Sequence, residues 1–139
     1  MSNLSISERK LRGVTILDLA GKITLGESNR QLHEAIRRLV ADGQQNIILN
    51  LAKITSIDSS GLGEIVAGFS TVKAAGGSLK LINMPDRLDD LMTITKLYTV
   101  FEIYETEAEG IGAFETSELT TGPLDEKFAA GARSGSSLL

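Results

Sequence analysis

Residues 46–72 read NIILNLAKITSIDSSGLGEIVAGFSTV, and this stretch predicts a strand, a short loop and a helix in succession. Residues 47–51 are apolar except for Asn50, which is typical of a strand that is buried on both faces of a sheet. After the loop, apolar side chains recur at helical spacing, at Leu62, Ile65, Val66, Phe69 and Val72. A buried strand that leads into an amphipathic helix predicts an α/β protein with parallel strands.

The same alternation of short strands and amphipathic helices extends over most of the chain. The other predicted elements are strands at 4–9 and 14–19, a helix at 28–41, a strand at 78–82, a helix that begins near Pro85, a strand at 100–104 and a helix from Thr106 to about Ser117. The predicted order is ββαβαβαβα, a mixed sheet of about five strands with about four helices. We expect the helices to cover one face of the sheet, and less regular structure or a partner to cover the other.

The chain has 139 residues, a length that suits one domain. Residues 1–116 carry the periodic pattern and are predicted to form that domain. From Ser117 onward the composition shifts to Ser, Thr, Gly, Ala and mixed charge, so residues 117–139 are predicted to be a mobile tail.

The composition argues against several classes of function. The formal net charge is −4 and Lys and Arg form no long run, so we expect no nucleic-acid partner. No apolar stretch approaches the roughly 20 residues that cross a bilayer, and no signal-peptide pattern is present, so we expect a cytoplasmic protein without a membrane partner. The chain has no cysteine, which excludes disulfides and thiolate chemistry.

Catalytic and metal sites also lack the residues that they need. His33 is the only histidine, and one histidine cannot supply a histidine-rich metal site. The chain has no Gly-x-Ser-x-Gly motif, and a catalytic triad would require His33 to meet Ser59 or Ser60 in space. We therefore expect neither an enzyme nor a bound metal or cofactor.

The loop Asp58-Ser59-Ser60-Gly61 precedes the second predicted helix. A helix N-terminus presents free backbone N–H groups and a partial positive charge, so it stabilises an anion. A phosphate on an exposed serine there would add roughly −1.5 to −2 charges beside Asp58 and Glu64. Gly61 and Gly63 have no side chain, so the backbone of another protein could approach closely. The loop therefore suits a phosphorylation switch that expels a protein partner.

The same residues have a simpler interpretation as a helix cap. Asp and Ser are among the favoured N-cap residues, and removal of such a cap typically costs about 1 kcal/mol. Caps are far more common than phosphorylation sites, so composition alone favours a cap at this loop. The residues by themselves leave both interpretations open.

At this loop the sequence resembles the STAS domain family, specifically the stand-alone bacterial anti-sigma factor antagonists, over about residues 4–115. The stretches that carry the resemblance lie at 47–51 with 57–63, at 76–81 and at 91–97. The motif Asp-Ser-Ser-Gly-Leu-Gly after an apolar strand is specific in this context, and the other two stretches support it. The resemblance implies a STAS-like mixed sheet and a protein that binds other proteins.

The resemblance also implies a mechanism. In that family the unphosphorylated protein binds an anti-sigma factor that is a serine kinase, which frees the sigma factor. The kinase uses ATP to phosphorylate the serine directly after the loop Asp, and a serine phosphatase restores the active form. Carried over, the phosphate acceptor is Ser59, with Ser60 as the alternative. The residues implied in partner binding are Thr24, Asp58, Ser60, Gly61, Leu62 and Gly63, and the class implies a monomer or weak dimer.

One stretch departs from the family pattern. Many members have Gly-Glu-Leu/Ile-Asp at the end of the second strand, where the acidic residues help to form the partner surface. This chain has Gly21-Lys22-Ile23-Thr24 instead. The departure leaves three interpretations: a divergent kinase partner, a STAS scaffold that is phosphorylated differently, or a non-switching STAS scaffold or transporter-accessory binding module.

Overall fold

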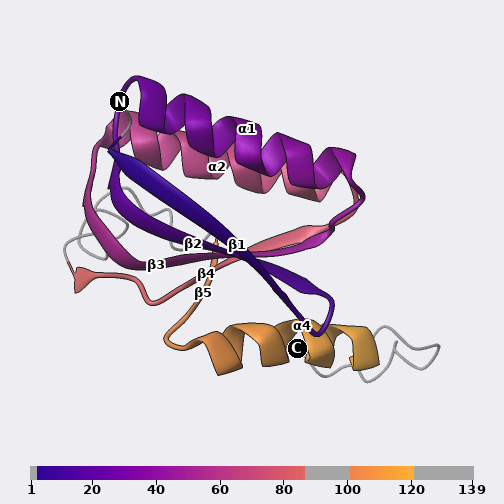
Figure 1. Cartoon of the computed structure of the whole chain (residues 1–139). Coiled ribbons are helices and arrows are strands. Elements are labelled where there is room, and N and C mark those ends of the chain that lie inside the picture. Colours follow the sequence, from indigo (N-terminus) through magenta and orange to yellow (C-terminus); the bar gives the residue numbers. More distant parts are fainter. Residues whose placement is uncertain (1–2, 87–100, 121–139) are drawn as a thin grey trace.

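The computed structural model describes residues 3–86 and 101–120 of the 139-residue chain (Figure 1). Its elements are β1 (Leu4–Leu11), β2 (Val14–Ile23), α1 (Glu27–Ala41), β3 (Asn46–Ile57), α2 (Ser59–Ala74), β4 (Ser78–Ile82), β5 (Glu102–Tyr104) and α4 (Glu107–Thr120). The predicted α/β class is confirmed, with a five-stranded sheet and three helices in the described part of the chain. The predicted helix that begins near Pro85 lies almost wholly outside the described residues.

The sheet is mixed, as predicted, and its strands lie in the order β1-β2-β3-β4-β5. β1 and β2 form an antiparallel hairpin in which Leu11 lies opposite Val14, and the other neighbouring strands are parallel. The two turn residues, Arg12 and Gly13, both have positive φ angles, of 54° and 78°. Two-residue hairpins favour this turn because its twist matches the twist of the flanking strands.

The strand β3 lies at the centre of the sheet and is buried on both faces, as its apolar run predicts. Successive strand residues point to opposite faces, so Ile47 and Leu49 join one core while Ile48 joins the other. All three side chains are fully buried. β3 and β2 run beyond their predicted ends, to Ile57 and Ile23, and these two residues are paired in the sheet.

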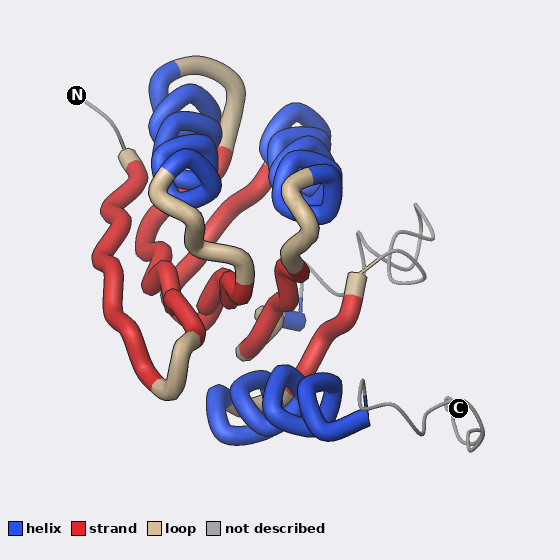
Figure 2. Tube along the Cα trace, turned by 90° about the vertical axis from the view of Figure 1, so that its right-hand side faces the viewer, coloured by secondary structure: helices blue, strands red, loops and turns tan. Residues whose placement is uncertain are grey.

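One face of the sheet is covered by α1 and α2, which lie side by side (Figure 2). The buried side chains that these helices contribute include Leu32, Ile36 and Leu39 from α1 and Leu62, Ile65 and Val72 from α2. Gly68 lets the helices approach closely, because a Cβ there would lie 2.6 Å from the Cδ1 atom of Ile36. The apolar sides of both helices, which the sequence pattern predicts, therefore pack against the sheet.

The expectation that all the helices cover one face is wrong, because α4 packs on the opposite face (Figure 2). Ile111 and Phe114 of α4, one helical turn apart, are buried in a second core with residues of the sheet, namely Val14, Ile16, Ile48 and Ile82. Gly110 allows the close approach, since a Cβ there would lie 2.8 Å from Ile82. The glycine that weakens the helix by propensity is thus needed for its packing.

A buried lysine also lies beneath α4. Lys80 exposes 2% of its surface, and its Nζ lies 4.5 Å from the centre of the Phe114 ring. The same Nζ forms an ion pair with Glu102 Oε1 at 2.6 Å, which compensates the buried charge. Lys80 therefore links β4, β5 and α4.

The C-terminal predictions are tested only in part. The last helix runs to Thr120, three residues beyond the predicted end near Ser117. Residues 121–139 lie outside the described part of the chain, so the division into a domain at 1–116 and a tail at 117–139 stays a prediction.

We predict that Phe114→Ala lowers the free energy of unfolding by about 3 kcal/mol, since removal of a buried aromatic ring leaves a cavity in the second core. The measurement is urea denaturation, with Leu11→Ala as control because Leu11 is 43% exposed. An equal and small effect of both substitutions would contradict the packing of α4 on the sheet.

Candidate functional site

The predicted loop lies at the carboxyl end of β3, where α2 begins at Ser59. β2 ends beside it, because Ile23 is paired with Ile57, and the chain then leads through residues 24–26 into α1. Loops at the carboxyl ends of adjacent parallel strands meet at one edge of a sheet, and this edge is where α/β proteins commonly bind ligands. The structure thus brings the regions of Thr24 and Asp58 together.

Asp58 is the N-cap of α2, as the simpler interpretation of the loop predicts. Its Oδ1 atom accepts hydrogen bonds from Gly61 N at 2.8 Å and from Ser60 Oγ at 2.6 Å. Its Oδ2 atom accepts a third bond, from Leu25 N in the loop before α1, at 3.0 Å. The Ser60 hydroxyl, and then the Leu25 and Gly61 amides, hold the pKa of Asp58 below its ordinary value. Asp58 is therefore an ionised cap that joins two loops.

The two loop serines lie in different surroundings. Ser59, the first residue of α2, has an exposed side chain. Ser60 is partly buried, and its Oγ donates a hydrogen bond to Asp58 and accepts one from Asn29 Nδ2 at 2.9 Å. A reagent or enzyme in solution can thus reach the Ser59 hydroxyl more readily than the Ser60 hydroxyl.

The two loop glycines also differ. A Cβ at Gly61 would overlap the carbonyl oxygen of Ile23, which already accepts a hydrogen bond from Asp58 N at 3.3 Å. Gly61 is therefore required for the close packing of the loop against β2. A Cβ at Gly63 would meet nothing within 4 Å, so Gly63 leaves an open patch of backbone on the surface.

Two other predicted partner-binding residues are engaged within the protein. Leu62 is 4% exposed and packs in the core beneath α1 and α2. Thr24 is partly buried, and its backbone N–H and carbonyl both bond to the hydroxyl of Ser28 at the start of α1. Beside Thr24, the side chain of Leu25 is 81% exposed.

Sequence reasoning missed Leu25 and Asn29. An apolar residue between Thr24 and Gly26 in a predicted loop is a weak signal for an exposed leucine. Asn29 lies in a predicted helix, and its contact with Ser60 depends on how two helices pack. No pattern in the sequence carries that information.

His33 does not complete a catalytic triad. Its Nδ1 atom lies 2.9 Å from Glu64 Oε2, across the contact between α1 and α2. Within residues 3–86 and 101–120, no hydrogen bond joins His33 to Ser59 or Ser60, and no group of His, Cys, Asp and Glu side chains is placed to hold a metal ion. None of the helices in these ranges is both long and apolar enough to span a bilayer.

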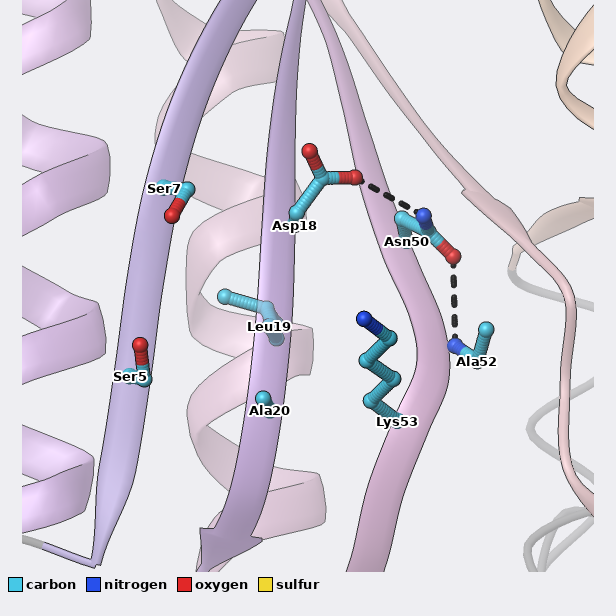
Figure 3. A pocket seen from close by; sticks show the side chains of 8 residues that line it. All are labelled: Ser5, Ser7, Asp18, Leu19, Ala20, Asn50, Ala52 and Lys53. Carbon is cyan, nitrogen blue, oxygen red and sulfur yellow. Dashed lines mark hydrogen bonds between the residues drawn. The ribbon is translucent and has the colours of Figure 1, made fainter.

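A separate hollow of about 420 Å³ lies on β1, β2 and β3 (Figure 3). Its lining residues are Ser5, Ser7, Asp18, Leu19, Ala20, Asn50, Ala52 and Lys53. Asp18 accepts a hydrogen bond from Asn50 at 2.8 Å and pairs with Arg9 at 2.6 Å, and Arg9 lowers the pKa of Asp18. None of the predicted site residues lines this hollow, so it is separate from the loop at Asp58.

The family can now be assigned. The STAS domain model matches residues 5–110, about three-quarters of the chain. The chain belongs to the STAS domain family. The match includes the Asp58 loop and both helices that pack against it.

Known relatives of this STAS domain include proteins of similar length. The anti-sigma F factor antagonist of Paenibacillus polymyxa is 28% identical over 116 residues, which cover 81% of this chain and 97% of the relative. The anti-sigma-B factor antagonist of Bacillus subtilis (strain 168) is 31% identical over 109 residues, which cover 78% and 98%. The structure of the Bacillus cell fate determinant SpoIIAA in the phosphorylated form superposes with a TM-score of 0.63 at 20% identity, covering 79% of this chain and 99% of that one. This last likeness concerns the fold.

We predict opposite effects for alanine at the two loop glycines. Gly61→Ala should lower the free energy of unfolding by about 1–3 kcal/mol, because the methyl group forces the loop away from Ile23. Gly63→Ala should raise it by about 0.5–1 kcal/mol, because alanine favours a helix and the site is open. Urea denaturation measures both, and a destabilised Gly63→Ala variant would contradict the predicted open space.

The lowered pKa of Asp58 predicts a pH-dependent contribution to stability. A carboxylate with a lowered folded-state pKa stabilises the fold above its unfolded pKa of about 3.9, and this contribution is lost as pH falls through the folded-state pKa. The difference in unfolding free energy between the unsubstituted protein and Asp58→Ala should therefore shrink in acid. Denaturant titrations from neutral pH into acid measure it. A difference independent of pH would show that the cap needs no charge.

Proposed function

We propose that this STAS domain is an anti-sigma factor antagonist whose affinity for its partner is switched by phosphorylation of Ser59. The observation that carries the proposal is the exposed Ser59 hydroxyl at the start of α2, beside an Asp58 and a Ser60 that bond to each other. The names of the two curated relatives support the class, since both are antagonists of anti-sigma factors.

Before phosphorylation, the surface around Ser59 suits contact with another protein. The Leu25 side chain is 81% exposed, and the neighbouring Gly26 and the nearby Gly63 expose backbone. An exposed apolar side chain beside backbone that carries no side chain allows close packing with a partner. In the proposed mechanism an anti-sigma factor that is a serine kinase binds here and releases its sigma factor.

The kinase then transfers a phosphoryl group from ATP. The Ser59 oxygen forms a bond to the γ-phosphorus, the bond from that phosphorus to ADP breaks, and the hydroxyl proton passes to a base of the kinase. Asp58 is a poor base for this step, because three hydrogen bonds lower its pKa. This chain supplies the acceptor hydroxyl, and the kinase supplies the rest of the chemistry.

The phosphate changes the charge of the surface without requiring a change of fold. It adds roughly −1.5 to −2 charges, close to the ionised Asp58. The N-terminus of α2 stabilises an anion at this position, so the helix should stay folded. The added charge and its hydration weaken binding to the kinase. A serine phosphatase hydrolyses the phosphate ester and restores the binding surface, in a cycle that operates in the cytoplasm, where ATP and sigma factors are found.

The second candidate is a non-switching STAS scaffold or transporter-accessory module. The end of β2, beside the loop, favours this candidate. Lys22 and Thr24 stand there in place of the acidic residues of many family members, and Lys22 is exposed while Thr24 bonds to Ser28. In that case Asp58 serves only as a cap. The two candidates differ in whether the chain accepts phosphate.

We predict that incubation with its cognate anti-sigma factor kinase and ATP adds one phosphate to this chain, at Ser59. Intact-mass analysis measures the uptake, and Ser59→Ala should abolish it. Ser70→Ala is the matched control, because Ser70 is another exposed serine of α2 and its loss should leave uptake unchanged.

The same sample tests the switch. The phosphorylated protein should bind the kinase at least about tenfold more weakly than the unphosphorylated one, since desolvation of the charged phosphate at the interface should cost at least about 1.4 kcal/mol. Phosphate uptake by Ser59→Ala equal to the unsubstituted chain would reject Ser59. No uptake by either would favour the non-switching scaffold.

A further inference from the structure

We propose that Asn29 is a positioning residue that makes Ser59, rather than its neighbour Ser60, the phosphate acceptor. This inference rests on the proposed function, because it concerns which serine the kinase uses. Asn29 lies in the first turn of α1, and Ser60 lies in the first turn of α2. One hydrogen bond, from Asn29 Nδ2 to Ser60 Oγ at 2.9 Å, joins them.

The direction of this bond is determined by Asp58. A serine hydroxyl has one proton to donate, and Ser60 donates it to Asp58 Oδ1 at 2.6 Å. The Ser60 oxygen can therefore only accept a bond from Asn29, so the amide nitrogen must face it. Asn29 Oδ1 is buried and has no hydrogen-bond partner among the described residues. Among the described residues, the side-chain amide of Asn29 therefore makes its hydrogen bond to Ser60 through Nδ2, and its Oδ1 makes none.

The two bonds together hold the Ser60 hydroxyl in place. Phosphoryl transfer requires the attacking oxygen to turn a lone pair toward the γ-phosphorus, in line with the leaving oxygen. The Ser60 hydroxyl donates its proton in a hydrogen bond to Asp58, and one of its lone pairs accepts a hydrogen bond from Asn29. The Ser60 side chain is also partly buried. Rotation toward an incoming phosphate would break both bonds. Ser59 meets no such restraint, since its side chain is exposed.

Loss of the Asn29 amide removes only one side of this restraint. Asp58 keeps its bonds from Gly61 N and Leu25 N, so the cap and the loop persist. An outward rotamer of Ser60 then costs one hydrogen bond, to Asp58, in place of two. Ser60 should become a competent acceptor, and this is a gain of reactivity that simple destabilisation would not produce.

The test uses the full chain in its own cells, so that the native kinase acts on it. Four forms replace the chromosomal copy: unsubstituted, Ser59→Ala, Ser59→Ala with Asn29→Ala, and Ser59→Ala with Gln31→Ala. Each protein is purified, and fragment-ion mass spectrometry measures the phosphate at residue 60. Gln31→Ala is the matched control, because Gln31 is an amide of the same helix that bonds instead to Leu4 O, at 3.0 Å.

The expected result is phosphate on Ser59 of the unsubstituted chain and only background phosphate on Ser60 of Ser59→Ala. Adding Asn29→Ala should raise the occupancy of Ser60 by about tenfold, the change in population that loss of one hydrogen bond permits. Adding Gln31→Ala should leave it at background. Background occupancy with Asn29→Ala, equal occupancy with Gln31→Ala, or phosphorylation of Ser60 in Ser59→Ala alone would each overturn the role of Asn29.

A second measurement needs no kinase and separates this inference from the proposed function. In equal parts of H₂O and D₂O, the Cβ resonance of a serine splits when its hydroxyl proton exchanges slowly. The Ser60 resonance should be split in the unsubstituted protein and in Gln31→Ala, and single in Asn29→Ala. A single resonance in the unsubstituted protein, or a split one in Asn29→Ala, would overturn the restraint. Absence of phosphate from the unsubstituted chain would instead overturn the proposed function, and the selection between serines with it.

Discussion

The burial of β3 on both faces is the constraint on which the rest of the structure depends. Ile47 and Leu49 require cover on one side of the sheet, and Ile48 requires it on the other. The helices α1 and α2 bury the side of Ile47 and Leu49, and α4 buries the side of Ile48. The same strand, continued to Ile57, delivers Asp58 to the edge where β2 also ends. The candidate site is thus a consequence of how the central strand is buried.

The strands and the first two helices could be predicted from the sequence, because each has a local period or an apolar run. The face of the sheet that α4 covers could not be predicted. The spacing of Ile111 and Phe114 indicates that one side of a helix is buried, but it does not indicate which face of the sheet that side packs against. The loop at Asp58 was predicted from its motif. The contact of Asn29 with Ser60 was not, because it joins residues 31 positions apart through the packing of two helices.

The cap and the proposed switch are compatible uses of one loop. Asp58 caps α2 through its bond from Gly61 N, and it also accepts a bond from the Ser60 hydroxyl, which holds that side chain partly buried while Ser59 stays exposed. Structural and functional interpretations of such a motif are often set against each other. Here the structural role of the aspartate creates the difference between the two serines on which a modification could act.

The edges of the sheet bear on how copies of the chain behave toward one another. β1 forms one edge and carries the exposed charged residues Glu8, Arg9 and Lys10, while β5, the other edge among the described strands, spans only Glu102–Tyr104. Exposed edge strands can template aggregation, and charged side chains or short length oppose it. Both edges of the sheet in the described part of the chain therefore oppose strand-to-strand association between copies of this protein.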